Sequence, residues 1–172
     1  MLVIYAKLEI SARDRVEIED IRQRFDRLQG RVEPHFTLVF PFAGVSVGEV
    51  LGHVQHIATE VEPIPFKLAK IAAVRDPLSP GAHLFFLPDE GVQQITDLHD
   101  RLYSGVLATR LHPTAAYLPH VTVGRFERYE DAKTAAASLP AVDIPGRLSV
   151  MTIGDFDGEG VEDLHNVRLG AP

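Results

Sequence analysis

The chain of 172 residues contains no cysteine, which excludes disulfides, thiolate nucleophiles and metal sites built on cysteine. It also lacks a long apolar run, because no stretch approaches the ~20 residues that a membrane-spanning helix needs. The N-terminal run Met1–Lys7 has neither the charged segment nor the longer apolar segment of a signal peptide. These absences predict a soluble, cytoplasmic protein that has no membrane partner.

Basic residues are in the minority. Lys and Arg number 17 against 24 Asp and Glu, and the formal net charge is −7. A protein that grips a long stretch of nucleic acid normally carries a basic patch or stripe, so an extended nucleic-acid surface is not expected. A hydrophobic fraction of 45% and a charged fraction of 24% are ordinary for a globular protein. Together with the length, they predict one compact domain over residues 1–172.

One short pattern occurs twice. The segment Pro34–Pro41 (PHFTLVFP) is followed 85 residues later by Pro119–Phe126 (PHVTVGRF), and both read Pro-His-apolar-Thr-apolar. Each copy lies in an apolar run of strand character. Side chains alternate faces along a strand, so each His and its Thr point to the same side. Two such strands would place two imidazoles and two hydroxyls around one point.

That constellation suits a phosphate ester. One imidazole removes a proton, the other delivers one, and the hydroxyls hydrogen-bond the phosphoryl oxygens. The alternative is that both histidines are ordinary strand residues, but the shared flanks and periodicity favour a paired functional site. A third triplet, His112-Pro113-Thr114, has proline at its centre and is interpreted as loop.

The remaining pattern predicts an α+β protein in which a helix–strand unit is duplicated. Ser11 is the expected N-cap of the first helix, and Ser46 is expected to open the second. The expected strands are Leu2–Ile10, His35–Phe40, Ile64–Val74, Ala82–Leu87, His120–Phe126, Arg147–Ile153 and Leu164–Leu169, and the expected helices are Arg13–Gln29, Ser46–Val61, Val92–Thr109 and Glu130–Leu139.

The two motifs resemble those of the 2H phosphoesterase superfamily, and within it the 2′-5′ RNA ligase-like (RNA 2′,3′-cyclic phosphodiesterase) group. His35–Leu38 matches the first family motif. His120–Arg125 resembles the second, with Val123 in place of the usual leucine. Pro65–Leu68 through Leu84–Pro88 resembles the family's central hairpin, so the resemblance covers nearly the whole chain.

The resemblance implies two pseudo-symmetric lobes of antiparallel sheet with outer helices and an active-site groove between them. It also implies hydrolysis of 2′,3′-cyclic phosphates, at RNA ends or in small cyclic nucleotides, without a metal or another cofactor. The expected partner is therefore a small nucleotide or the phosphate ester at an RNA end.

Residue roles follow from the same resemblance. His35 and His120 are the expected catalytic pair, with His120 as the base and His35 as the acid, and Thr37 and Thr122 are expected to bind the phosphate. Arg125 is a further candidate for substrate binding. Strand alternation would turn it to the opposite face from Thr122 unless a bulge, which Gly124 could supply, intervenes. Tyr5 and Lys7, on the first strand, could face the groove, but core or surface positions are favoured for both.

Other functions use the same residues. The site could cleave or ligate 2′-5′ phosphodiesters, or hydrolyse an ADP-ribose cyclic phosphate. A binding module for phosphate esters without turnover is a different class, and so is a purely structural role. The sequence leaves open the natural substrate, the ribose oxygen that leaves and the oligomeric state.

Overall fold

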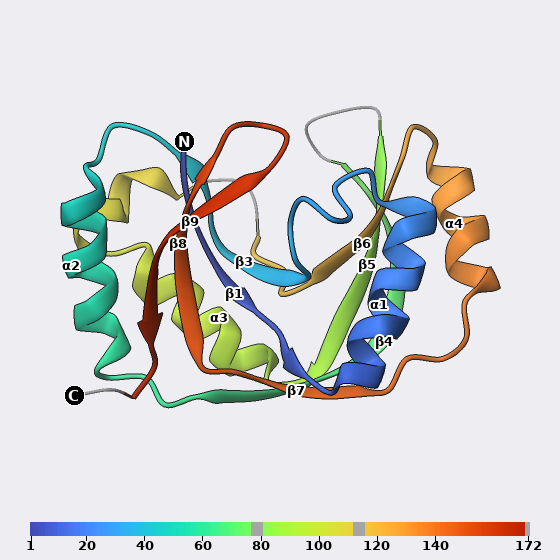
Figure 1. Ribbon diagram of the computed structural model, residues 1–172, viewed down its shortest axis with the longest axis horizontal. Helices are drawn as coiled ribbons and strands as arrows, with labels where there is room; N and C mark the ends of the chain where they lie inside the picture. The colour runs from blue at the N-terminus through green and yellow to red at the C-terminus, as the bar shows by residue number, and fades with distance from the viewer. Residues whose placement is uncertain (77–80, 112–115, 171–172) are drawn as a thin grey trace.

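The computed structural model describes residues 1–76, 81–111 and 116–170, and a single curled sheet of nine strands organises them (Figure 1). The strand order is β2-β7-β4-β5-β6-β3-β1-β8-β9, and each neighbouring pair is antiparallel. The strands are β1 (Leu2–Lys7), β2 (Glu9–Ile10), β3 (His35–Phe42), β4 (Ile64–Arg75), β5 (Ala82–Glu90), β6 (Val121–Phe126), β7 (Ile144–Leu148), β8 (Val150–Phe156) and β9 (Val161–Arg168). The helices are α1 (Ala12–Phe25), α2 (Val47–Ala58), α3 (Val92–Leu102) and α4 (Tyr129–Ser138), with a 3₁₀ turn, η1, at Gly105–Arg110.

The helices divide into two pairs, one for each lobe of the sheet. In Figure 1, α2 and α3 lie on one side of the molecule and α1 and α4 on the other. Helix α3 packs on β3 and α2 on β9, whereas α1 packs on β6 and α4 on β4 and β5. Apolar side chains between helices and sheet are fully buried, as at Ile18, Val54, Leu98 and Ala132. The predicted α+β class with two antiparallel lobes and outer helices is confirmed. No helix within the described residues is long and apolar enough to cross a membrane.

Two expected strands are each broken by one residue. The expected strand Leu2–Ile10 divides at Leu8 into β1 and β2, and the expected strand Arg147–Ile153 divides at Ser149 into β7 and β8. In both cases the chain passes from one lobe to the other, because β1 pairs with β8 while β2 pairs with β7. The Ser149 hydroxyl donates to the Glu9 carboxylate at 2.8 Å where the two crossings meet. The sequence of each expected strand is strand-like throughout, so it does not show where the chain changes from one partner strand to another.

The helix starts were easier to predict than the helix ends. Ser11 caps α1 through the amide of Asp14, and Ser46 forms a capping box with Glu49 at the start of α2. The predicted cap at Ser11 and the predicted helix start at Ser46 are thus confirmed. The expected helix Val92–Thr109 instead stops at Leu102 and continues as η1. The triplet His112–Thr114 lies outside the described residues.

A shift in strand register separates Thr122 from Gly124. Phe85 is opposite Thr122 and Leu84 is opposite Gly124, so one residue of β6, Val123, is extra at this point. The sequence had left such a bulge open as the one way for Arg125 to reach the face of Thr122. A β-carbon on Gly124 would lie 2.9 Å from Cβ of Phe25, the last residue of α1, so only glycine lets the helix approach the bulge this closely.

We expect Gly124→Ala to destabilise the protein by about 1–3 kcal/mol, because the added methyl overpacks the contact between α1 and β6. Gly52→Ala is the matched control. Gly52 lies within α2, and a β-carbon there meets nothing within 4 Å, so the change should stabilise by about 0.5–1 kcal/mol through helix propensity. Urea unfolding of both variants measures the two effects. Equal stability of wild type and Gly124→Ala would contradict the close packing.

Candidate functional site

The two motif strands are neighbours in the centre of the sheet. Strands β3 and β6 pair through Phe36 and Val121, both fully buried. Extending this antiparallel register by one residue each way sets His35 against Thr122 and Thr37 against His120. All four of these side chains are half-buried, on the face opposite the buried Phe36 and Val121. The fold therefore brings together the two imidazoles and two hydroxyls that the sequence singled out.

Each histidine is held in the same way by its own backbone. Nδ1 of His35 lies 2.7 Å from the carbonyl oxygen of Glu33, and Nδ1 of His120 lies 2.6 Å from the carbonyl oxygen of Leu118. A carbonyl can only accept, so Nδ1 must carry the proton in both rings. In each motif a proline separates the histidine from its acceptor, and its fixed φ restricts the short turn. Nε2 is then the nitrogen left to exchange protons.

Each histidine also has an aromatic neighbour on the adjoining strand. Tyr5 is opposite Thr37, and its ring meets that of His35 edge-on at 5.1 Å between centroids. Phe85 is opposite Thr122, and its ring stacks on that of His120 at 3.8 Å. Each half of the site, or half-site, therefore consists of one His, one Thr and one aromatic neighbour. The half-site of His35 contains the phenol of Tyr5, and the half-site of His120 contains the hydrocarbon ring of Phe85. Sequence reasoning missed Phe85, and it favoured a core or surface position for Tyr5 over one facing the groove.

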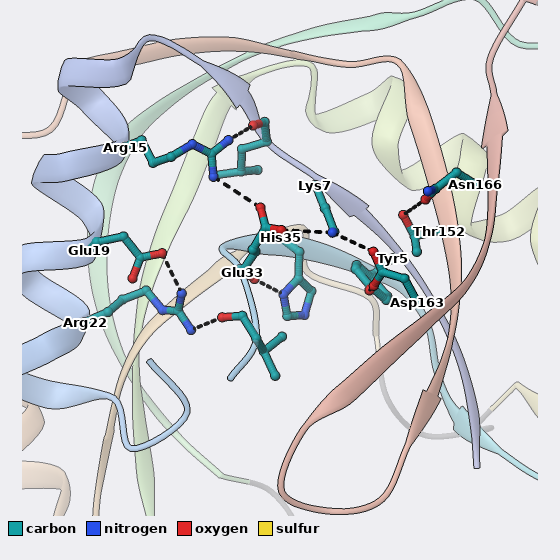
Figure 2. A network of polar contacts seen from close by, with 12 residues as sticks. Tyr5, Lys7, Arg15, Glu19, Arg22, Glu33, His35, Thr152, Asp163 and Asn166 are labelled. Carbon is teal, nitrogen blue, oxygen red and sulfur yellow. Dashed lines mark hydrogen bonds and ion pairs between the residues drawn. The ribbon is translucent and has the colours of Figure 1, made fainter. Parts of the chain in front are cut away.

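The Tyr5 side of the site carries a network of charges (Figure 2). The Tyr5 hydroxyl donates to Asp163 of β9, and Lys7 lies between Glu33 at 2.9 Å and Asp163 at 2.6 Å. Lys7 is opposite His35 in the register of β1 and β3. One signal for Tyr5 and Lys7 was present in the sequence, because residues two apart on a strand share a face. Their partner Asp163 is 156 residues from Lys7 and had no such signal.

Arg125 lies on the other side of the site. The bulge at Val123 brings it opposite His83, on the face that also carries Phe85 and Thr122. Its Nε is 3.6 Å from the carboxylate of Asp26, a buried residue that in turn accepts from Nε of Arg22 at 3.1 Å. The buried Arg22–Asp26 pair therefore directs the exposed Arg125 guanidinium along the edge of the site.

A third histidine, which no sequence pattern connects with the motifs, borders the site. His83 stacks on Phe85 at 5.5 Å, on the ring that also stacks on His120. Its Nε2 is 3.4 Å from the Asp76 carboxylate. His83 falls on the site face because it is two residues before Phe85 on β5, which only the pairing of β5 with β6 reveals.

The surroundings lower the pKa of both motif histidines. Burial is the main cause at His120 and outweighs the bond to the Leu118 carbonyl; with the charges of His35, His83 and Arg125, it lowers the pKa to about 4. Burial also lowers the pKa of His35, against the effect of the Glu33 carbonyl, and Arg22 and Arg125 add to the lowering. The ring stacked on Phe85 is therefore neutral at pH 7 in the free protein.

Within the described residues, no group of three or more His, Asp or Glu side chains is placed to hold a metal ion. The residues that the sequence singled out supply imidazoles, hydroxyls and one guanidinium, and the neighbouring Lys7 adds an ammonium group. Such a set can bind and protonate an anion, and the expected independence of metal stays a prediction.

Comparisons with known proteins agree with one another. The family model described as the 2′-5′ RNA ligase superfamily matches residues 9–157. A Bacillus licheniformis protein named "Putative phosphoesterase" is 33% identical over 107 residues, which make up 60% of this chain and 59% of the relative. The match thus spans less than two thirds of that relative's own length.

Solved structures share the fold. The protein TT0787 of Thermus thermophilus superposes with a TM-score of 0.66 at 15% identity, covering 99% of this chain and 98% of the other. E. coli LigT in complex with 3′-AMP gives a TM-score of 0.59 at 17% identity, with the same coverage. At these identities the likeness shows a common architecture of sheet and helices.

We expect the stability of the protein to fall as pH drops from about 6.5 toward 4, in part because of His120. A histidine whose pKa is lower in the folded state contributes stability that is complete above the unfolded pKa and lost as pH falls through the folded pKa. In this window His120 takes up roughly one proton on unfolding. His120→Gln should therefore make the free energy of unfolding depend less steeply on pH. Urea unfolding at a series of pH values measures it.

His56→Gln is the matched control, because His56 is exposed on α2 away from the site. This variant should keep the pH dependence of the wild type. If His120→Gln shows the wild-type slope as well, the pKa of His120 is not lowered as described.

Proposed function

This chain belongs to the 2′-5′ RNA ligase superfamily, and we propose that it is a metal-independent phosphodiesterase that hydrolyses 2′,3′-cyclic phosphates. The substrates would be RNA ends or small cyclic nucleotides. One observation carries the proposal: two imidazoles share a site, and each has Nδ1 bonded to a backbone carbonyl, so that both Nε2 atoms are available for proton transfer. Binding alone does not need a complementary acid and base.

In the proposed reaction, His120 is the base. Its neutral Nε2 takes a proton from water, and the water oxygen forms a bond to phosphorus. The bond from phosphorus to one ribose oxygen breaks, and the Nε2–H of His35 gives its proton to that departing oxygen. The product is a ribose phosphomonoester. The lowered pKa of His120, which burial beside Phe85 causes, supports this assignment because a base must be neutral before it can act.

The other site residues would hold the phosphate. The hydroxyls of Thr37 and Thr122 would donate to the non-bridging oxygens as negative charge builds up on them. Arg125 would add a positive charge at the edge of the site, where Asp26 orients it. Structures of E. coli LigT with 3′-AMP and with ATP show that a protein of this fold accepts small nucleotides, which supports a nucleotide substrate.

We expect the purified protein to convert 2′,3′-cyclic nucleotides, and an RNA with a cyclic phosphate end, to monoesters in the presence of EDTA. His35→Ala and His120→Ala should each reduce the rate by about 10²–10⁴-fold, since each removes one proton transfer. Phosphorus NMR follows the reaction and identifies the oxygen that leaves. His56→Ala, on the exposed face of α2, is the control that should keep full activity.

Other outcomes lead to other functions. Turnover of a 2′-5′ dinucleotide or an ADP-ribose cyclic phosphate, with no turnover of 2′,3′-cyclic phosphates, would keep the mechanism and change the substrate. Binding of these nucleotides without any turnover would indicate a binding module instead.

We expect the pH profile of kcat/KM to be bell-shaped with its maximum in an acidic window below about pH 6.5, because the pKa of both histidines is lowered. Below this window His120 is protonated and cannot act as the base. Above it His35, whose pKa is also lowered, loses the proton that it must donate. Bound phosphate stabilises both imidazolium forms, so the kcat profile should lie at higher pH than that of kcat/KM. A kcat/KM maximum above pH 8 would contradict these protonation states.

A further inference from the structure

The two strands that carry the half-sites, β3 and β6, pair with each other over a very short length. Strand β3 pairs with β1 over most of its length and β6 with β5, but β3 and β6 share one registered pair, Phe36 and Val121. Beyond Phe36 the first motif continues without β6 alongside it. A reaction that uses one imidazole from each strand needs the distance between the strands to be held closely, because a misplacement of about 1 Å can cost on the order of 100-fold in rate.

Side chains replace the missing strand partner along β3. The Tyr117 hydroxyl donates to the carbonyl oxygen of Thr37 at 2.9 Å, and Nδ1 of His99 donates to that of Leu38 at 2.7 Å. Further along, the amide of Phe40 donates to the Tyr103 hydroxyl at 3.1 Å. Three polar groups of the β3 backbone are thereby satisfied by side chains.

These side chains form one packed group. The rings of His99 and Tyr117 are 3.7 Å apart and nearly parallel, at 6°, and Tyr103 meets His99 at 4.8 Å. His99 is only 2% exposed and is anchored on α3, so the stack holds the Tyr117 ring against a rigid helix. Burial raises the pKa of Tyr117, so its hydroxyl remains a donor throughout the working range of pH.

Tyr117 differs from the other two in its place in the chain. It directly precedes Leu118, whose carbonyl accepts from Nδ1 of His120. The same short segment therefore orients the second motif's histidine and bonds to the backbone of the first motif's threonine. His99 and Tyr103, in contrast, belong to α3 and its C-cap, and neither lies next to a motif.

We propose that Tyr117 is a positioning residue that sets the separation of the two half-sites. Its hydroxyl ties the segment that carries His120 to the backbone of Thr37, in place of the strand pairing that ends at Phe36. This inference rests on the proposed function, since it assigns Tyr117 a part in the reaction that needs both histidines.

Tyr117→Phe tests the proposal, because it removes the hydroxyl and keeps the ring that stacks on His99. We expect kcat for a 2′,3′-cyclic nucleotide to fall by about 10- to 100-fold with a smaller rise in KM, since each half-site stays intact while their separation relaxes. The two limbs of the pH profile should be retained. Tyr103→Phe is the matched control: it removes a hydroxyl bonded to the same strand, but one that does not join the motifs.

The two variants should lower Tm by similar amounts, and only Tyr117→Phe should lose activity. If both variants lost the same activity, in proportion to their loss of Tm, the role of Tyr117 would be structural only and the proposal would be overturned. A Tyr117→Phe variant with the kcat of the wild type would overturn it as well.

A second measurement does not depend on turnover. Inorganic phosphate is titrated into each protein, and its binding is followed through the imidazole NMR signals of His35 and His120. In the wild type and Tyr103→Phe, both signals should respond with one dissociation constant; in Tyr117→Phe, binding should be weaker. A wild type that turns over no substrate would refute the proposed function, whereas unchanged phosphate binding in Tyr117→Phe would refute the positioning role.

Discussion

The structure depends on one contact, the antiparallel pair of Phe36 and Val121 at the centre of the sheet. Both side chains are fully buried, and Phe36 also meets Phe66 edge-on at 5.2 Å. Because side chains alternate along a strand, burying these two turns the residues on either side of them to the opposite face. A shift of register by one residue would bury the histidines and expose the core, so packing and the geometry of the site are set by the same pairing.

The two halves repeat a plan but differ in chemistry. In each, a proline precedes the histidine, Nδ1 bonds to a carbonyl two residues back, and an aromatic ring lies opposite the threonine. His120 stacks on the hydrocarbon ring of Phe85, while His35 meets the edge of Tyr5, whose hydroxyl is bonded to Asp163. Burial is the main cause that lowers the pKa of both imidazoles, but the nearby charges differ: His83 adds to the lowering at His120, and Arg22 adds to it at His35.

The expectations that concern local structure agree with the fold more closely than those that concern neighbours. The cap at Ser11 and the helix start at Ser46 agree with the sequence pattern because capping is decided within a few residues. The breaks at Leu8 and Ser149 were missed because both sides of each break have strand character, and only the choice of partner strand changes there. Strand alternation showed that Arg125 would reach the site face only through a bulge, but it did not show whether the bulge forms. The Asp26 carboxylate that orients Arg125 had no local signal, since it comes from the end of α1.

The sequence by itself determined the two His-x-Thr strands, their shared face and the α+β class, because a strand's alternation and its apolar pattern are local properties. Only the tertiary structure decided what surrounds each imidazole. Phe85, His83 and Asp163 reach the site from separate parts of the chain, and no local pattern connects them with the motifs. Tyr117 lies beside the second motif, but its bond to Thr37 of the first motif exists only in the fold. Desolvation and hydrogen bonding act through space, so the proton affinity and the spacing of the two histidines were settled when the lobes packed together.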